Sequence, residues 1–171
     1  MNLLNTFKTW FSGKTEAEHL RRGRLGERAA QKFLQKGGMK FLTANYRSPR
    51  GEIDLIFRTR ERSDPVEKPG GLGQRLMAAV HFLFHGHGTG CLVFVEVKTR
   101  SSEQWARPAA AVDAAQRLHI TKAALDYLRL LRQPRVAVRF DIVEVLLEEG
   151  RVREVRHLPN AFPMQGGHRY Y

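Results

Sequence analysis

Two apolar segments of the chain carry charged side chains in a spacing that could support metal-dependent chemistry. Residues 91–100 read CLVFVEVKTR, and residues 51–57 read GEIDLIF. In an extended strand alternate side chains share a face, so Glu96 and Lys98 point together to the face opposite that of Val93, Val95 and Val97. Burying charge in an apolar strand is costly. This pair of side chains therefore needs a chemical explanation.

Asp54 joins the pair if the two segments are neighbouring strands. Facing Cβ atoms of paired strands lie about 5 Å apart, and two carboxylates that close repel each other unless a proton or a cation lies between them. Mg²⁺ takes one or two carboxylates together with waters and substrate phosphate. We therefore expect Asp54 and Glu96 to bind Mg²⁺ or Mn²⁺. Lys98 would hold the attacking water and neutralise charge that builds on a phosphodiester transition state.

A structural explanation of the same residues stays open. Glu96 and Lys98 can form an ion pair, and Asp54 can pair with Arg47 or Arg58. The D…ExK pattern is short, and pairs of opposite charge are common in proteins.

The first half of the chain predicts a helix and a hairpin that would position Asp54. Thr15 and Glu18 have the spacing of a capping box, and the helix should run from Thr15 to about Lys36, before a Gly-Gly stop. Strands are predicted over 39–47 and 52–58, joined by a Ser-Pro-Arg-Gly turn.

In the second half we expect a central strand over 91–99, a long helix over 109–132, and strands over 135–147 and 152–157. The long helix would return the chain to a parallel neighbour by a right-handed crossover. The order α-β-β-β-α-β-β predicts an α/β fold, with a mixed sheet flanked by helices.

Strand alternation also predicts which side chains face the core. Ile53, Leu55 and Phe57 should share one core face. Phe140 and Ile142 should point inward with Val138, which makes Asp141 a structural candidate before a catalytic one.

The length of 171 residues suits one domain. We divide the chain into a lead over 1–14 with helical apolar spacing, a single domain over 15–162, and a tail over 163–171. Residues 59–90 read as an insertion at a hairpin tip. Its His81, His85 and His87 could bind Zn²⁺, but no matching Cys or acid accompanies them, which favours a solvated segment.

The charge of the chain points to a polyanionic partner. Lys and Arg total 29 against 17 Asp and Glu, a formal net charge of +12, which favours nucleic acid through counterion release and steering. A compositional bias of the genome and attraction to anionic lipid are the alternatives. Phosphate contacts are expected at the arginines that flank the site: Arg47, Arg50, Arg100 and Arg107. The alternative is that these arginines are solvated surface charges.

One cysteine, Cys91, permits no intrachain disulfide. No signal peptide and no apolar stretch long enough to span a membrane are evident. We therefore expect a cytoplasmic protein without stable membrane insertion.

Several segments carry a resemblance to a known family. GRLGERAAQKFLQKGG, NYRSPRGEIDLIF, LVFVEVKTRSS, RFDIVEV and HLPNAF strongly resemble, in this order, the YraN-like family of bacterial proteins. That family is similar to the archaeal Holliday-junction resolvases and to the PD-(D/E)xK, restriction-endonuclease-like superfamily. The match covers roughly residues 23–60 and 91–162.

The resemblance implies a restriction-endonuclease-like core and a metal-dependent endonuclease that acts on DNA, including branched or repair intermediates, as a homodimer. It assigns Asp54, Glu96 and Lys98 to the D, E and K positions. It assigns Glu27 to an acid of the first helix, and Gln116 to a polar position on the helix that follows ExK.

Two features depart from the family. Ala115 stands where the family usually has Lys, and the insertion over 59–90 is longer than expected. The alternatives to an enzyme are a nucleic-acid-binding module of the same fold without cleavage, and an adaptor protein.

Overall fold

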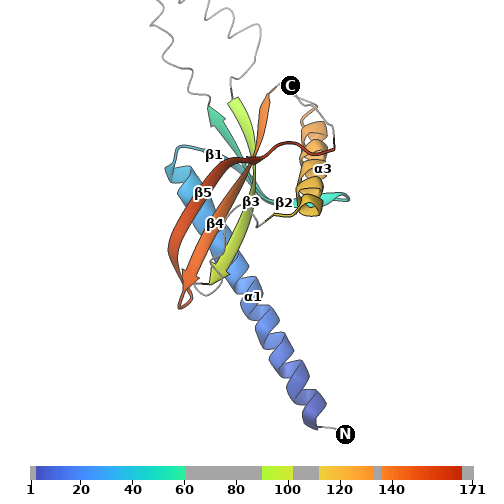
Figure 1. Cartoon of the computed structure of the whole chain (residues 1–171), viewed down its shortest axis with the longest axis vertical. Helices are drawn as coiled ribbons and strands as arrows, with labels where there is room; N and C mark the ends of the chain where they lie inside the picture. Colours follow the sequence, from blue (N-terminus) through green and yellow to red (C-terminus); the bar gives the residue numbers. More distant parts are fainter. Residues whose placement is uncertain (1–2, 61–89, 102–111, 133–135, 167–171) are drawn as a thin grey trace, which may run out of the picture.

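The computed structural model describes residues 3–60, 90–101, 112–132 and 136–166, with side chains of the first helix described from Glu18 onward. These residues form a sheet with one long helix on each side (Figure 1). The elements, in chain order, are α1 (Leu3–Lys36), β1 (Lys40–Ser48), β2 (Gly51–Arg60), β3 (Gly90–Ser101), α3 (Ala114–Leu130), β4 (Ala137–Glu148) and β5 (Arg151–Phe162).

The described strands make a five-stranded mixed sheet in the order β1-β2-β3-β4-β5. β1 and β2 form a hairpin whose last pair is Ser48 with Gly51, and β2 continues antiparallel to β3. β3 and β4 are parallel, because the chain crosses through α3 between them. β5 returns antiparallel along β4. The predicted α/β class is confirmed, and the arrangement is consistent with a restriction-endonuclease-like core.

Each face of the sheet packs against one helix. On the face that we call the α1 face, Ala30 and Leu34 contact the strands. On the opposite α3 face, Ile120, Ala124 and Leu128 do the same. The buried strand residues of the α1 face are Leu55, Phe57, Val93, Val95, Val143, Val145 and Leu147. Those of the α3 face are Ile53, Ile56, Leu92, Phe94, Phe140, Ile142 and Phe162.

Two glycines allow the helices to approach the strands closely. A Cβ atom at Gly26 of α1 would lie 1.9 Å from the Oγ1 atom of Thr99 on β3. A Cβ atom at Gly51, in the β1–β2 turn, would lie 2.5 Å from the carbonyl oxygen of His119 on α3. Both helices are therefore held against the part of the sheet that contains Asp54 and Glu96.

The element boundaries correct several expectations. α1 begins at Leu3 and not at Thr15, so it includes most of the predicted lead and extends past the sheet toward the N-terminus (Figure 1). α3 begins at Ala114, because Asp113 is its N-cap, and not at residue 109. β5 continues to Phe162, well past the predicted end at residue 157.

The prediction that Ile53, Leu55 and Phe57 share one face of β2 is wrong for Ile53. Leu55 packs on the α1 face, whereas Ile53 packs on the α3 face. The strand β1 changes face at the same level, between Ala44 and Tyr46. Asn45 lies between these two with φ 51°, a left-handed conformation that turns the following side chain to the other face.

Several predictions concern residues outside the described ranges. They are most of the insertion with its histidine cluster, Arg107, and the end of the C-terminal tail. Among the helices of the described ranges, none is both long and apolar enough to cross a membrane.

Candidate active site

The predicted acids meet where β2 and β3 separate. The regular pairing of the two strands ends at Leu55 with Val95, so the next facing positions are Asp54 and Glu96. In place of a further backbone pair, the Oδ2 atom of Asp54 accepts a hydrogen bond from the backbone N–H of Val97 at 2.7 Å. Asp54 is thereby fixed against the strand that carries Glu96 and Lys98.

Glu96, Lys98 and Gln116 form a closed ring of contacts on the α3 face. The Nζ atom of Lys98 lies 2.9 Å from Oε1 of Glu96 and donates to Oε1 of Gln116 at 3.0 Å. The Nε2 atom of Gln116 donates to the same Glu96 oxygen at 2.7 Å. Glu96 is only 8% exposed, so these bonds compensate part of the cost of burying its charge.

The start of α3 explains the position of Gln116. The side chain of Asp113 accepts the backbone N–H of Gln116 at 2.8 Å, which caps the helix. An Asp followed three residues later by Gln has the spacing of a capping box. Here the Gln116 side chain contacts Glu96 and Lys98 across the gap between helix and sheet.

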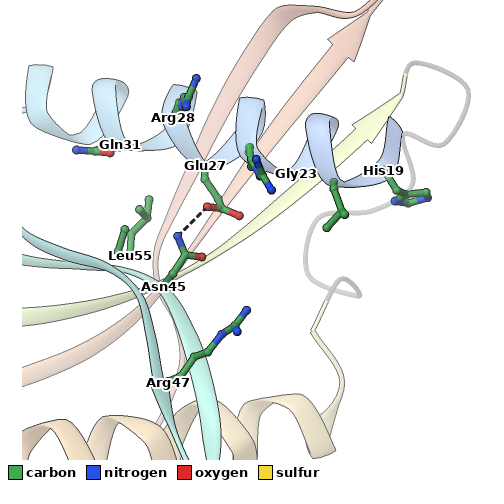
Figure 2. A pocket seen from close by; sticks show the side chains of 11 residues that line it. His19, Gly23, Glu27, Arg28, Gln31, Asn45, Arg47 and Leu55 are labelled. Carbon is green, nitrogen blue, oxygen red and sulfur yellow. Dashed lines mark hydrogen bonds between the residues drawn. The ribbon is translucent and has the colours of Figure 1, made fainter. Parts of the chain in front are cut away.

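Glu27 approaches the site from α1. Its Oε2 atom accepts a hydrogen bond at 3.3 Å from the side-chain amide of Asn45, the left-handed residue of β1 that lies opposite Asp54 (Figure 2). Glu27 is also close enough to Asp54 to raise the pKa of that carboxyl group.

The surroundings of Asp54 raise its pKa to about 7. Burial is the largest cause, and repulsion from Glu96 and from Glu27 adds to it. The N–H of Val97 and the positive charge of Lys98 act in the opposite direction. Near neutral pH the carboxyl group is therefore close to half protonated, a state that a bound cation would reverse.

The donors of this site suit a hydrated Mg²⁺ ion better than a fully protein-bound metal. No group of three or more His, Cys, Asp or Glu side chains with metal-binding geometry occurs within the described ranges. Two carboxylates are enough for Mg²⁺, which usually keeps several waters and takes further oxygen ligands from phosphate. Structural Zn²⁺ sites need four protein ligands rich in Cys and His. Asp54 and Glu96 would hold the ion.

The arginines predicted to contact phosphate differ in their surroundings. Arg47 is open to solvent, with its side chain 80% exposed and its Nε atom 3.4 Å from Glu52. Arg50 is engaged by Asp126 of α3, whose pKa it lowers to about 2, so a phosphate would have to compete with this ion pair. Arg100 has a buried Nε atom without a hydrogen-bond partner in the described part of the chain.

Glu144 is a site neighbour that sequence reasoning missed. It lies on β4 directly beside Lys98 in the parallel pairing and is 1% exposed. Burial raises its pKa, while the charges of Arg100 and Arg156 act against this rise. The alternation of RFDIVEV carried the signal, because Phe140, Ile142 and Glu144 are two residues apart.

Asp141 has the structural role that the sequence suggested. It is fully buried, and its Oδ2 atom lies 2.7 Å from Nε2 of His157. Its Oδ1 atom accepts hydrogen bonds from Nε of Arg139 at 3.0 Å and from the backbone N–H of Asn160 at 2.9 Å. These partners stabilise the irregular pairing between β4 and β5 near Phe140.

Comparison with known proteins gives one family. Residues 26–145 match the family model described as "Uncharacterised protein family UPF0102". A UPF0102 protein of Trichlorobacter lovleyi is 32% identical over 142 residues, which cover 83% of this chain and 90% of the relative. A UPF0102 protein of Syntrophotalea carbinolica is 34% identical over 149 residues, covering 87% and 97%. A UPF0102 protein of Bifidobacterium longum subsp. infantis is 32% identical over 142 residues, covering 82% and 91%.

Proposed function

The chain belongs to the UPF0102 (YraN) family, and from this premise and the geometry of its site we propose that it is a metal-dependent endonuclease that hydrolyses phosphodiester bonds in DNA. One observation carries the proposal. Asp54 and Glu96 lie just beyond the last β2–β3 pair, close enough for Glu96 to raise the pKa of Asp54, and Lys98 and Gln116 contact Glu96. A pair of facing carboxylates is unfavourable without a proton or a cation.

Each side chain has a role that follows from its contacts. Asp54 and Glu96 would hold Mg²⁺ or Mn²⁺, which supplies Lewis-acid polarisation of the phosphate and a water of lowered pKa when bound. Gln116 orients the Glu96 carboxylate by donating to its Oε1 atom. Glu27 adds negative charge on the α1 side of Asp54.

Lys98 is the residue that we propose to act on the reacting phosphate. Its ammonium group shares its bonds between Glu96 and Gln116. In the reaction this ammonium group would turn from Glu96 toward a phosphate oxygen and stabilise the negative charge that develops there. It can also orient the water that attacks the phosphorus.

The substrate and assembly follow from the charge and from the family resemblance. The net charge of +12 favours a polyanion. We propose DNA, with branched or repair intermediates as the preferred form, a homodimer as the working unit, and the cytoplasm as the compartment.

A nucleic-acid-binding module without cleavage is the competing proposal, and one observation favours it. The Lys98 ammonium is satisfied by Glu96 and Gln116 within the chain itself, as it would be in a site that serves only stability.

Cleavage assays distinguish the two proposals. Purified full-length protein is incubated with linear, flapped and four-way DNAs in Mg²⁺ or Mn²⁺. We expect cleavage that falls about 100-fold or more in Lys98→Gln, the loss typical of removing one group that stabilises transition-state charge. Gln can still donate to Glu96, so this variant should fold.

Two controls complete the assay. Asp54→Asn keeps an oxygen that can accept the Val97 N–H and loses the charge, so it should also be inactive. Lys40→Ala removes an exposed lysine at the far end of β1 and should cleave like the unmodified chain. Binding of these DNAs without cleavage under any metal, or equal cleavage by all variants, would reject the enzyme proposal.

A further inference from the structure

A pocket of about 700 Å³ lies between α1 and the β1–β2 hairpin (Figure 2). One wall is the α1 face that carries Gly23 and Glu27, and the opposite wall is β1. The residues that line it include Gly23, Arg24, Glu27, Arg28, Asn45 and Arg47.

The charge of the pocket suits an anion. Three of the residues that line it are arginines, Arg24 and Arg28 on α1 and Arg47 on β1. Arg24 and Arg28 are four residues apart, so they lie on the same side of the helix, one turn from each other. The Arg fork matches phosphate oxygens in a bidentate manner.

The single acid of this wall does not cancel that charge. Glu27 points between α1 and β1, where it is held by the amide of Asn45 at 3.3 Å (Figure 2). The three arginines of the lining outnumber this one acid, so the described lining keeps a net positive charge.

The pocket reaches the site at Asp54, from the α1 side of the sheet, whereas Glu96, Lys98 and Gln116 contact one another on the α3 side. Asn45 lines the pocket. It also lies opposite Asp54, between the paired residues Ala44 with Leu55 and Tyr46 with Ile53. Leu55 lines the pocket as well and is the chain neighbour of Asp54. A strand whose scissile phosphate lies at Asp54 would pass its next phosphates along this pocket.

The size of the pocket selects an unpaired strand. A volume of about 700 Å³ lies within the range of roughly 300–1,000 Å³ that small-ligand pockets show. That space suits a nucleotide or two, whereas a double helix is recognised by protein elements that enter its grooves and would lie outside a pocket of this size. The described residues that line the pocket include no Phe, Tyr or Trp. Contacts would therefore be to the backbone and not to stacked bases, which makes binding independent of sequence.

We propose that this pocket binds the sugar-phosphate backbone of an unpaired DNA strand next to the scissile phosphate, so that the preferred substrate is a duplex with a single-stranded flap. The inference rests on the proposed function, since it names the substrate of the same site.

Gly23 provides a way to block the pocket without disturbing the fold. A Cβ atom there would meet nothing within 4 Å, and the residue lies inside a helix that tolerates Ala and Leu. Gly23→Leu therefore places a side chain in the pocket, and Gly23→Ala is the matched control. Arg28→Gln removes one guanidinium group of the pocket, and Arg151→Gln removes an exposed one at the β4–β5 turn.

The test measures fluorescence anisotropy of a labelled short duplex with a flap of a few nucleotides, and of the same duplex without a flap. Titrations are done with the full chain in EDTA. We expect Gly23→Leu and Arg28→Gln to weaken binding of the flapped DNA about tenfold, the equivalent of one lost charge-assisted contact. Their affinity for the blunt duplex should change less than about twofold, within the usual effect of exposed charges.

Three results would overturn the inference. The first is equal affinity of the unmodified chain for flapped and blunt DNA. The second is flap binding by Gly23→Leu and Arg28→Gln that matches Gly23→Ala and Arg151→Gln. The third is displacement of the flapped DNA by free AMP near the Kd of the flap, which would indicate a small-molecule pocket.

Cleavage of the same DNAs in Mg²⁺ separates this inference from the proposed function. If the unmodified chain cuts DNA but blocking the pocket leaves its flap preference intact, the inference fails and the endonuclease proposal stands. If flap binding depends on the pocket and no DNA is cut, the endonuclease proposal fails and the pocket stands as a DNA-binding site.

Discussion

Asp54 combines two features that rarely coincide in a purely structural carboxylate. It is fixed by a backbone hydrogen bond from Val97, yet it lies among other acids that raise its pKa to about 7. A structural acid usually gains a cationic partner that lowers its pKa, as Asp126 does from Arg50. An acid whose charged form is penalised in the free protein is suited to receive a cation.

The first prediction concerns proton release at Asp54. With a pKa of about 7, the group is mostly protonated at pH 6 and mostly ionised at pH 8, and a bound dication requires the ionised form. We expect each bound Mn²⁺ ion to release about half a proton at pH 7, close to one proton at pH 6 and almost none at pH 8. Affinity should weaken as the pH falls below 7. Isothermal titration calorimetry in buffers of different ionisation enthalpy measures the release.

Asp54→Asn is the control for this measurement, because it cannot ionise and should neither bind Mn²⁺ nor release the proton. Proton release that is zero at pH 6, or that does not vary between pH 6 and pH 8, would contradict the pKa argument.

At the residue scale, alternation and turn signals were enough to group Asp54, Glu96 and Lys98. They gave no account of Glu144, although its spacing from Ile142 was visible in the sequence. Its burial depends on the register that sets it beside Lys98 on the neighbouring strand. β3 and β4 are neighbours in the sheet but far apart in the sequence. Their register depends on the crossover through α3, which local sequence patterns do not encode.

At the element scale, the β1–β2 hairpin changes face at the level of Asp54. Strict alternation predicted that Ile53 and Leu55 share a face, and they do not. The cause is the left-handed Asn45, since Asn tolerates positive φ better than other residues with side chains. A single Asn in a strand pattern does not predict a left-handed backbone conformation, so the geometry of the site could not be derived from periodicity alone.

The second prediction tests how the hairpin turn is held against α3. Gly51→Ala would bring a Cβ atom within 2.5 Å of the His119 carbonyl oxygen, and a helix backbone cannot move away cheaply. We expect a loss of about 1–3 kcal/mol in the free energy of unfolding, the usual cost of overpacking. Urea denaturation followed by circular dichroism measures it.

Gly23→Ala is the matched control for Gly51→Ala, because its Cβ meets open space in a helix. It should leave stability unchanged or raise it by up to about 1 kcal/mol. Equal stability of the two variants would show that the turn does not pack on α3 as described.

The helices show where local signals mislead. The capping-box spacing of Thr15 and Glu18 predicted a helix start, but α1 continues through it from Leu3. A cap stabilises a helix end by only about 1 kcal/mol, so it does not end a helix whose preceding residues are also helical. Asp113 and Gln116 have the same spacing and do mark the start of α3.

At the scale of the whole molecule, the element order predicted the mixed sheet and the parallel pair of β3 and β4. These features follow from general rules on connections, such as the crossover through a helix. What the order did not give is the open pocket between α1 and the hairpin. That pocket depends on how far α1 lies from β1, which small residues such as Gly26 set through their contacts.

The third prediction uses the net charge of +12. Binding to a short DNA duplex should weaken linearly on a plot of log K against log salt. A slope of about −3.6 to −5.4 is expected for some four to six phosphate contacts, at about −0.9 for each contact. Arg28→Gln should reduce the slope for flapped DNA by about one. Anisotropy titrations between low and physiological salt measure both. Affinity that does not depend on salt would argue against DNA as the partner.

A crystal of the protein grown with Mn²⁺ and examined by anomalous scattering would show whether Asp54 and Glu96 hold a metal ion together. We expect a peak about 2.1 Å from carboxylate oxygens of both residues, the distance expected for octahedral coordination by oxygen. The peak should be absent from crystals of Asp54→Asn. Mn²⁺ bound elsewhere in the crystal with no peak between these two carboxylates, or the same peak in Asp54→Asn, would contradict this expectation.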